Sequence, residues 1–408
     1  MSSPHIPSRA RLTLLLGALA MFGAFSIDTV FPAFPAMASG LGVSKLAMQQ
    51  VISVYMAAYA GMSLFHGAIS DAIGRRPVLL VGVSVFVLSS IGCALAPTFG
   101  WLLAFRALQG LSAGVGLIVG RAVVRDLLEG EHAQRLMSHI SMIFGLAPAI
   151  APMIGGWVIA FADWRAIFWF LVAFGAAILL LVAWVLPETH PAANRVPFNA
   201  GTVWRTQRGM LANATFVRLA LVVTFNFASL FLYIASAPAF VMDHMGLNEQ
   251  QFAWFFVPTI GGMMLGAFTS GRLAGKLHAQ TIASIGFFFC LASVALNLGY
   301  SAWVDAPQAP WAVLPMMINA FGVALVFPVM TLAMLDMYPR QRGAASSMQA
   351  FISLGFNALV AGVLAAWVSH STLWLAAGSA VLSLLGWVLW LGYRPRCEQQ
   401  MPEPPQVE

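Results

Sequence analysis

The sequence predicts an all-α membrane protein with twelve transmembrane helices arranged in two six-helix bundles. Of its 408 residues, 60% are hydrophobic and only 8% are charged, whereas a soluble domain carries about 25% charged residues. Glycine, proline and charged residues divide the chain into twelve apolar runs, each long enough to cross a bilayer. One long polar segment separates the first six runs from the last six.

The apolar runs give the expected order of helices. The first run follows two arginines, as in a signal peptide, but it lacks a convincing small-residue cleavage site. We therefore interpret it as an uncleaved first span. The expected spans are 12–35, 48–70, 78–96, 99–120, 136–160, 164–186, 216–241, 251–274, 281–301, 311–335, 344–368 and 371–392.

These spans define four expected regions of the chain. Residues 1–186 form the first bundle, 187–215 a linker, 216–393 the second bundle and 394–408 a tail. The linker is predicted to carry a short interfacial helix around Val203–Ala212. The tail is polar and rich in proline, so we expect it to be disordered.

The basic residues predict the orientation in the membrane. Seventeen of the 20 Lys and Arg residues fall on one side of this topology, Lys45 and Arg165 fall on the other, and Arg106 lies within a span. Cytoplasmic loops carry such an excess, so we expect both termini in the cytoplasm of a bacterial inner membrane. These loops account for the net charge of +6, and no basic patch for nucleic acid is expected.

Two charged residues inside apolar runs mark the candidate site, Asp28 and Arg106. A charge in hydrocarbon costs about 3 kcal/mol or more and is a functional-site hypothesis by default. At about 1.5 Å per residue, both lie at a similar depth if their spans run in opposite directions. One interpretation is a structural ion pair between packed helices. The other, which we favour, is a proton-coupling and substrate site in a polar cavity.

A charged turn follows the second span. It contains Gly67, Asp71, Gly74, Arg75 and Arg76. Gly74 permits a positive φ, and the aspartate is able to cap a helix or pair with a cation. This stretch resembles the loop 2–3 signature of the major facilitator superfamily, whose members share the layout of twelve spans and a central cytoplasmic linker.

That resemblance implies the major facilitator fold and a conformational lock. It implies that Asp71 and Arg75 stabilise the outward-facing state by bridging the two halves, with Asp126 as a further charge partner. Ala72 stands where the family usually has Arg, so part of the usual charge relay is missing.

The fourth span carries Arg106, Gln109, Gly110 and Gly114. The two glycines form a GxxxG face for close helix packing. The Arg-x-x-Gln-Gly combination resembles the signature of proton-coupled members of the superfamily, which implies that the arginine takes part in coupling.

The fifth span carries paired prolines and paired glycines: Pro148, Pro152, Gly155 and Gly156. The prolines remove backbone donors and bend a helix, and the glycines let a neighbour approach. A generic kinked span would explain them. The run also resembles the antiporter signature found in exporters, which implies export.

Residues 12–170 resemble a narrower group, the Bcr/CflA drug-efflux branch. The similar stretches are IDTVFPAFP at 27–35, the region around Tyr55, RALQG, RAVVRD and LAPAIAPMIGG. Three departures fall in regions expected to contact the substrate: Thr29-Val30 after Asp28, Met62-Ser63-Leu64 in the second span, and His66 before the charged turn.

Polar residues within the spans are candidates for the substrate cavity, with packing or lipid contact as the alternative for those of the second half. They are Tyr55, Gln109, Asn226, Tyr233, Asn319, Gln349 and Asn357. Phenylalanines and Trp254 crowd the seventh and eighth spans. Such a lining suits apolar or aromatic molecules held by few directional contacts.

The function predicted from these features is proton-driven export of small, moderately apolar, drug-like compounds, with Asp28 carrying or sensing the proton and Arg106 tuning it. A specific metabolite exporter or importer of the same fold is the alternative. The three scattered cysteines offer no metal or disulfide spacing, and no nucleophile–base pair or phosphate loop is visible. We therefore expect no enzyme activity, metal or cofactor, and a monomer that depends on the bilayer and on the proton gradient.

Overall fold

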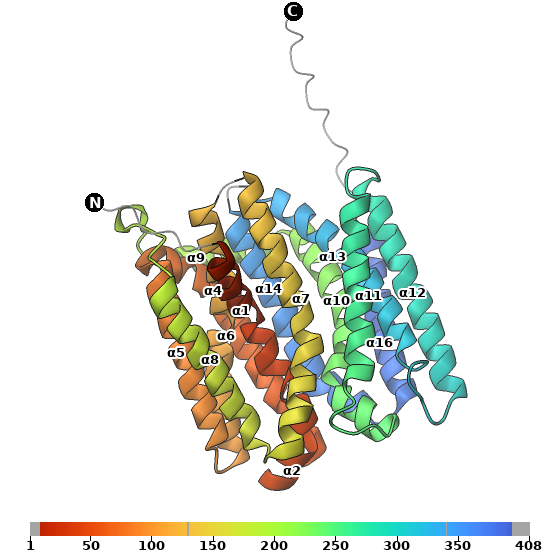
Figure 1. The fold of residues 1–408 in the computed structure, drawn as a ribbon. Helices are drawn as coiled ribbons and strands as arrows, with labels where there is room; N and C mark the ends of the chain where they lie inside the picture. The colour runs from red at the N-terminus through yellow and green to blue at the C-terminus, as the bar shows by residue number, and fades with distance from the viewer. Residues whose placement is uncertain (1–8, 129, 340, 394–408) are drawn as a thin grey trace, which may run out of the picture.

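The structure is a computed structural model that describes residues 9–128, 130–339 and 341–393. It consists of long helices lying side by side (Figure 1). Eleven helices among the described residues are long and apolar enough to cross a membrane. A further long helix, α7 (Gly130–Phe161), has an apolar segment at Gly145–Phe161. The predicted all-α membrane fold is confirmed, and the tail at 394–408 lies outside the described residues.

The helices of the N-terminal half coincide with the first six predicted spans. They are α1 (Arg9–Asp28), the 3₁₀ helix η1 (Phe31–Ala33), α2 (Phe34–Leu41), α3 (Lys45–Met48), α4 (Gln50–Ile73), α5 (Arg75–Ala94), α6 (Phe99–Leu127), α7 and α8 (Arg165–Val185). The first span is not one continuous helix: α1 ends at Asp28, where η1 and α2 take over. Pro32 and Pro35 lack backbone N–H donors, and this explains the break.

The linker contains η2 (Ala192–Asn194) and α9 (Ala200–Leu211), close to the predicted interfacial helix. Asn199 caps α9 by accepting a hydrogen bond from the backbone N–H of Thr202. Two of its side chains, Gln207 and Met210, are buried. They face the interior because α9 packs against α4, α10 and α14.

The C-terminal half contains the last six predicted spans, and two of them include π-helices. The elements are α10 (Ala214–Ala235), the π-helix η3 (Ala239–His244), α11 (Ala253–Leu273), α12 (Ala279–Trp303), α13 (Leu314–Asp336), α14 (Arg342–Leu359), the π-helix η4 (Val360–Leu364), α15 (Ala365–Val368) and α16 (Thr372–Leu391). Pro238 precedes η3. π-Helical turns are rare and often occur at functional sites.

The two halves meet along two helix pairs, α4 with α14 and α7 with α11. In Figure 1, α9 lies at one end of the molecule and α2 at the other; we call these the linker end and the distal end. At the distal end the apolar core is continuous across both halves, and the ring of Phe31 stacks on that of Phe256 with centroids 6.3 Å apart.

Candidate transport site and gates

Asp28 is the last residue of α1 and is buried, with 5% of its surface exposed. Within the described residues, its carboxylate accepts no hydrogen bond and has no cationic side chain within 4.0 Å. A buried carboxylate is costly unless a partner, water or a proton compensates it. Asp28 is therefore held at a position where gain or loss of a proton changes the local free energy strongly.

Arg106 lies fully buried on α6, and its charge is met by groups other than Asp28. Its Nη1 donates to the carbonyl of Ser26 at 2.9 Å and to Oε1 of Gln109 at 2.8 Å, and its Nε donates to the carbonyl of Val51 at 3.1 Å. Its guanidinium also lies 4.4 Å from the centroid of the Tyr55 ring, a favourable cation–π geometry. The direct ion pair that the sequence left open is absent from this structure.

The link between the two charged residues runs through the end of α1. Ser26 accepts the Arg106 hydrogen bond with its carbonyl and donates its hydroxyl to the phenol oxygen of Tyr55. The Tyr55 hydroxyl in turn donates to the carbonyl of Gly23 at 3.2 Å. Ser26 lies two residues before Asp28 on the same helix, so the contacts of Arg106 and Tyr55 reach α1 within one helical turn of the carboxylate.

The other predicted residues of the fourth span hold α6 against its neighbours. Gln109 donates from Nε2 to Oγ of Ser90 on α5 at 2.7 Å. A Cβ at Gly110 would collide with the carbonyl of Tyr55, and one at Gly114 would meet the rings of Tyr59 and His66. The GxxxG face of α6 therefore packs on α4, which brings Tyr55 over the arginine.

The polar residues predicted for the cavity from spans 7 and 10 lie inside the C-terminal half. Each of them makes its hydrogen bond there: Asn226 accepts from Cys290, Tyr233 accepts from Asn297, and Asn319 donates to Ser229. All three are about 1% exposed. In this state they join helices of one half, and a substrate contact for them stays a prediction.

The two predicted residues on α14 are nearer the seam between the halves. Gln349 donates to the hydroxyl of Thr331 on α13 at 2.9 Å. Asn357 is 3% exposed, and its Oδ1 has no hydrogen-bond partner among the described residues. Its neighbour Ala358 accepts a hydrogen bond from Ser53 of α4 at 2.8 Å. Asn357 is thus the predicted cavity residue of the C-terminal half with a free acceptor beside the N-terminal half.

A set of contacts across the halves closes the distal end, and we call it the distal gate. It comprises Lys45 with Asp243 at 2.6 Å, Gln50 with the carbonyl of Gly362 at 3.0 Å, and Ser53 with the carbonyl of Ala358. The ion pair is exposed, and such pairs contribute about 0–1 kcal/mol. The two hydrogen bonds go to carbonyls beside or within the π-helix η4, where the main-chain register changes.

The paired glycines of the predicted antiporter signature face two different partners. A Cβ at Gly155 would collide with the carbonyl of Thr29, next to Asp28, and one at Gly156 would collide with the carbonyl of Glu249 in the other half. Pro148 and Pro152 lie inside the same helix, α7. This part of α7 therefore contacts both the buried carboxylate region and, at Glu249, the other half.

Replacing Gly156 by Leu is expected to hold the distal gate apart, because the new side chain would occupy the space of the Glu249 backbone. The measurement is cross-linking of Lys45→Cys to Asp243→Cys by a short bifunctional thiol reagent. Gly145→Leu on the same helix is the control, since no atom lies within 4 Å of a Cβ there. Equal cross-linking in both leucine variants would contradict the assignment.

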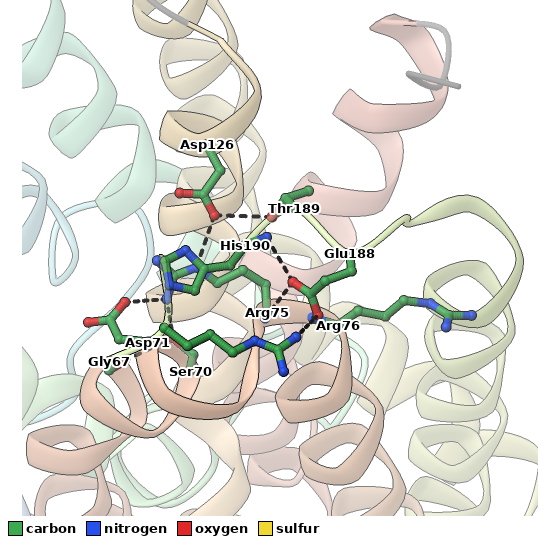
Figure 2. A network of polar contacts seen from close by, with 10 residues as sticks. Gly67, Ser70, Asp71, Arg75, Arg76, Asp126, Glu188, Thr189 and His190 are labelled. Atoms are coloured by element: carbon green, nitrogen blue, oxygen red, sulfur yellow. Dashed lines mark hydrogen bonds and ion pairs between the residues drawn. The ribbon is translucent and has the colours of Figure 1, made fainter. Parts of the chain in front are cut away.

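At the linker end, the charged turn is organised around the buried Arg75 (Figure 2). The arginine donates from Nε to Asp126 at 3.0 Å and from Nη1 to Asp71 and to Ser70, the latter at 2.7 Å. Ser70 in turn donates to the carbonyl of Gly67 at 2.9 Å. These contacts join α4, α5 and α6.

Glu188 completes this network. It lies just after the N-terminal bundle, and the sequence alone did not indicate a role for it. Its carboxylate accepts from the backbone N–H of Arg75 at 3.0 Å and of Arg76 at 3.3 Å, at the start of α5. An acid is favourable there because the first amides of a helix lack partners. Gly74 has φ +107°, and a Cβ on it would overlap the Glu188 carboxylate.

The contacts of this network lie within the N-terminal half and the linker. Thr189 donates to Asp126 at 3.1 Å, and the backbone N–H of Val196 donates to the carbonyl of Asp71 at 3.3 Å. The Arg76 guanidinium donates to the carbonyl of Ala183 at 2.8 Å. The bridge from Asp71 and Arg75 to the other half is not formed in this state and stays a prediction for the opposite one.

Replacing Glu188 by Ala is expected to loosen the linker, because two amides of α5 lose their acceptor. Loss of such a cap costs about 1–2 kcal/mol. Faster proteolysis of the linker and a lower unfolding temperature would show this. Asp336→Ala is the control, since Asp336 forms an exposed pair with Arg342 at the same end and should matter little. Identical proteolysis of both variants would refute the role of Glu188.

Comparison of the sequence with models of protein families identifies the family of this chain. The model described as Major Facilitator Superfamily matches residues 14–356. The chain belongs to the major facilitator superfamily. It is therefore a multi-pass membrane transporter and not an enzyme.

Individual members of the superfamily resemble the whole chain. "Uncharacterized MFS-type transporter YdgK" of Bacillus subtilis (strain 168) is 32% identical and aligned over 88% of this chain and 89% of its own. "Bicyclomycin resistance protein homolog" of Haemophilus influenzae is 27% identical over 86% and 88% of the two chains. "Multidrug resistance protein MdtL" of Escherichia fergusonii is 27% identical over 95% and 93%. These names agree with the resemblance to the Bcr/CflA branch.

Solved structures of other superfamily members share the fold. A D-xylose–proton symporter superposes with a TM-score of 0.70 at 14% identity, covering 93% of this chain and 97% of its own. The human organic anion transporter MFSD10 (TETRAN) superposes with a TM-score of 0.66 at 21% identity, covering 94% and 99%. At these identities the superpositions establish the fold and leave the substrate open.

Proposed function

We propose that the chain exports small, apolar or aromatic, drug-like compounds across the bacterial inner membrane in exchange for protons. The observation that carries this proposal is Asp28, a buried carboxyl group without a partner in the described residues, two residues from the contact with Arg106. The names of the H. influenzae and E. fergusonii relatives support drug export. The proton gradient is the only energy source proposed, without a cofactor, and the working unit is a monomer.

The proposed cycle is alternating access between two bundles, residues 1–186 and 216–393, joined by the linker at 187–215. The excess of Lys and Arg at the linker end supports a cytoplasmic location for that end and for both termini. The distal gate, which is closed in this state, then faces the periplasm. The bundles rock about a site near the midplane.

In this cycle Asp28 takes a proton when it faces the acidic side and releases it when substrate binds from the cytoplasm. The exchange needs substrate and proton to favour different protonation states of one site, or different conformations. The contacts that link Arg106 and Tyr55 to Ser26, two residues before Asp28, supply a route for this coupling. Loss of the proton leaves a charged carboxylate near the substrate path, which is unfavourable until the bundles move or a cationic substrate pairs with it.

Reporter fusions test the orientation on which this cycle rests. Fusions in the linker at residue 200 are expected to report a cytoplasmic location. A fusion at residue 163, next to Arg165 between α7 and α8, is expected to report the periplasm. A periplasmic location at residue 200 would overturn the orientation.

The function itself is tested in cells that lack their own efflux pumps. Cells expressing the protein are expected to retain less of a fluorescent aromatic drug than control cells, and collapsing the proton gradient should remove the difference. A susceptibility screen over many compound classes defines the range. Equal retention over the whole panel would favour a carrier for one metabolite, and accumulation of substrate in energised cells would indicate import.

A further inference from the structure

The linker helix α9 lies at the level where the membrane spans begin and end (Figure 1). Its buried side chains are Gln207 and Met210. Met210 belongs to one apolar cluster with Phe216, near the start of α10, and with Tyr338, between α13 and α14. Since the spans fill the hydrocarbon core, their ends lie at the depth of the phospholipid headgroups, and α9 lies at that depth too.

One flank of α9 carries two exposed apolar side chains and, beyond them, two exposed arginines. Residues of a helix follow one another at about 100° around its axis. Measured from the buried Gln207, Leu211 and Trp204 therefore lie at about 40° and 60°, and they are 43% and 58% exposed. Arg208 and Arg205 follow on the same side at about 100° and 160°, and both are exposed. Going outward from the bundle, the flank is first apolar and then basic.

Neither arginine is neutralised by a carboxylate of the described residues. α9 contains no acidic residue. The Arg208 side chain makes no hydrogen bond or ion pair within the described part of the chain, and Arg205 donates only to the carbonyl of Gly201 in its own helix, at 3.4 Å. Two guanidinium groups at headgroup depth are thus left to bind an anion, and the planar guanidinium matches phosphate oxygens well.

The apolar side chains of this region indicate the source of the anion. A free phosphate ion would bind the arginines but would leave the ring of Trp204 in water. A phospholipid offers a phosphate group and a hydrocarbon chain together, and tryptophan is enriched where the two meet. Val196 and Phe198, just before α9, are also apolar and are 65% and 45% exposed. Arginines beside exposed apolar residues are typical of helices that lie in the membrane interface.

We propose that this flank of α9 is a binding site for anionic phospholipids, separate from the transport site. Arg205 and Arg208 bind the phosphate groups. Trp204 and Leu211 contact the upper parts of the acyl chains. Because α9 packs on α4 of the N-terminal half and on α10 and α14 of the C-terminal half, the bound lipid anchors the linker at the membrane surface where the two halves meet.

Fluorescence quenching of the full-length protein in nanodiscs tests the site. A bimane fluorophore is attached at Trp204→Cys, in a chain that also carries Cys397→Ser, so that the two remaining cysteines, Cys93 and Cys290, are buried. The nanodiscs contain phosphatidylcholine and a fixed fraction of nitroxide-labelled phosphatidylglycerol or, in parallel, of nitroxide-labelled phosphatidylcholine. Quenching by the anionic lipid is expected to correspond to a preference of about fivefold or more, the effect of one arginine near an anionic membrane surface.

Two double variants of the labelled protein separate this site from a general effect of charge. Arg205→Gln with Arg208→Gln should abolish the preference for the anionic lipid, while quenching by phosphatidylcholine persists. Arg272→Gln with Lys276→Gln is the matched control, because it removes two exposed positive charges near the end of α11, at the same end of the molecule. This control should keep the preference.

Three results would overturn the proposal. Absence of quenching by either lipid would place the flank in water, where a soluble partner could reach it. Equal quenching by the two lipids would show that no anionic lipid is bound in preference. An equal loss of preference in the two double variants would assign it to the net charge of this end. Since no transport is measured, each of these results leaves the proposed export function standing.

Discussion

Replacing Asp28 by Asn is expected to abolish proton-driven export while the protein still folds. The amide has nearly the same shape but takes no proton in the physiological range. Because the carboxylate has no hydrogen-bond or ion-pair partner in the described residues, the change removes no contact. The unfolding free energy should shift by less than about 0.5 kcal/mol or rise.

Drug-induced proton release from the purified protein measures this directly. Wild type should release protons when an exported drug is added, and Asp28→Asn should not. Asp28→Glu should retain part of the activity, since the carboxyl group is kept at a shifted position. Asp163→Asn, an exposed acid with 59% of its side chain accessible, should behave as wild type.

The opposite outcome has a clear meaning. If Asp28→Asn releases protons as wild type does, another group carries them. His66 on α4 is the next group to test, because it is 4% exposed and its Nδ1 has no hydrogen-bond partner among the described residues. If Asp28→Asn also exports normally, the proposal that protons are coupled through α1 is wrong.

Replacing Arg106 by Ala is expected to eliminate export and to destabilise the N-terminal half. The change leaves the carbonyls of Ser26 and Val51 and the Gln109 side chain without their donor. Each buried acceptor that loses a charged donor costs about 1.5–3 kcal/mol. The sum is large compared with the stability of a typical protein.

Arg106→Lys separates the charge from the geometry. The ammonium group keeps the charge and three donors, but it lacks the planar fork that reaches three acceptors and stacks on a ring. Partial export and intermediate stability are therefore expected. Thermal unfolding and drug efflux, measured in parallel, show both effects.

Arg165→Ala is the matched control for that experiment. Arg165 also lies over an aromatic ring, 4.2 Å from the centroid of Trp164, and it pairs with an acid. Its side chain is 38% exposed, so water replaces the lost contacts. A loss of export in Arg165→Ala as large as in Arg106→Ala would show that burial of the arginine is not what matters.

The spans and the charged positions within them could be read from the sequence. Hydropathy is a local property, so the twelve predicted runs correspond to the eleven long apolar helices of the described residues and to α7, with errors of only a few residues at most ends. The linker helix was also predicted, because its polar composition contrasts with the flanking runs. The π-helices in the C-terminal half were not predicted, since no residue type specifies them. Pro238 before η3 was the one available signal.

The partners of the candidate site residues could not be read in the same way. Asp28 and Arg106 were expected at one depth, but the arginine binds carbonyls of Ser26 and Val51 instead of the aspartate. Asn226 and Asn319, which are predicted to line the cavity, make hydrogen bonds inside their own half in this state. The rotation of a helix about its own axis decides which partners its polar side chains meet. This rotation leaves the hydropathy of the helix unchanged, so hydropathy does not predict it.

The sequence by itself determined the membrane class, the order of the spans, the side on which the basic residues gather and the two charges that interrupt apolar runs. All of these follow from the cost of placing charge in hydrocarbon, which each residue carries wherever it lies. Only the tertiary structure decided that Glu188 caps α5, that Gly156 faces the other half and that Gln49 borders a cavity. Main-chain amides and carbonyls occur at every residue, so the sequence does not show which of them a side chain meets. The packing of the helices decides this, and it also decides where space is left between them.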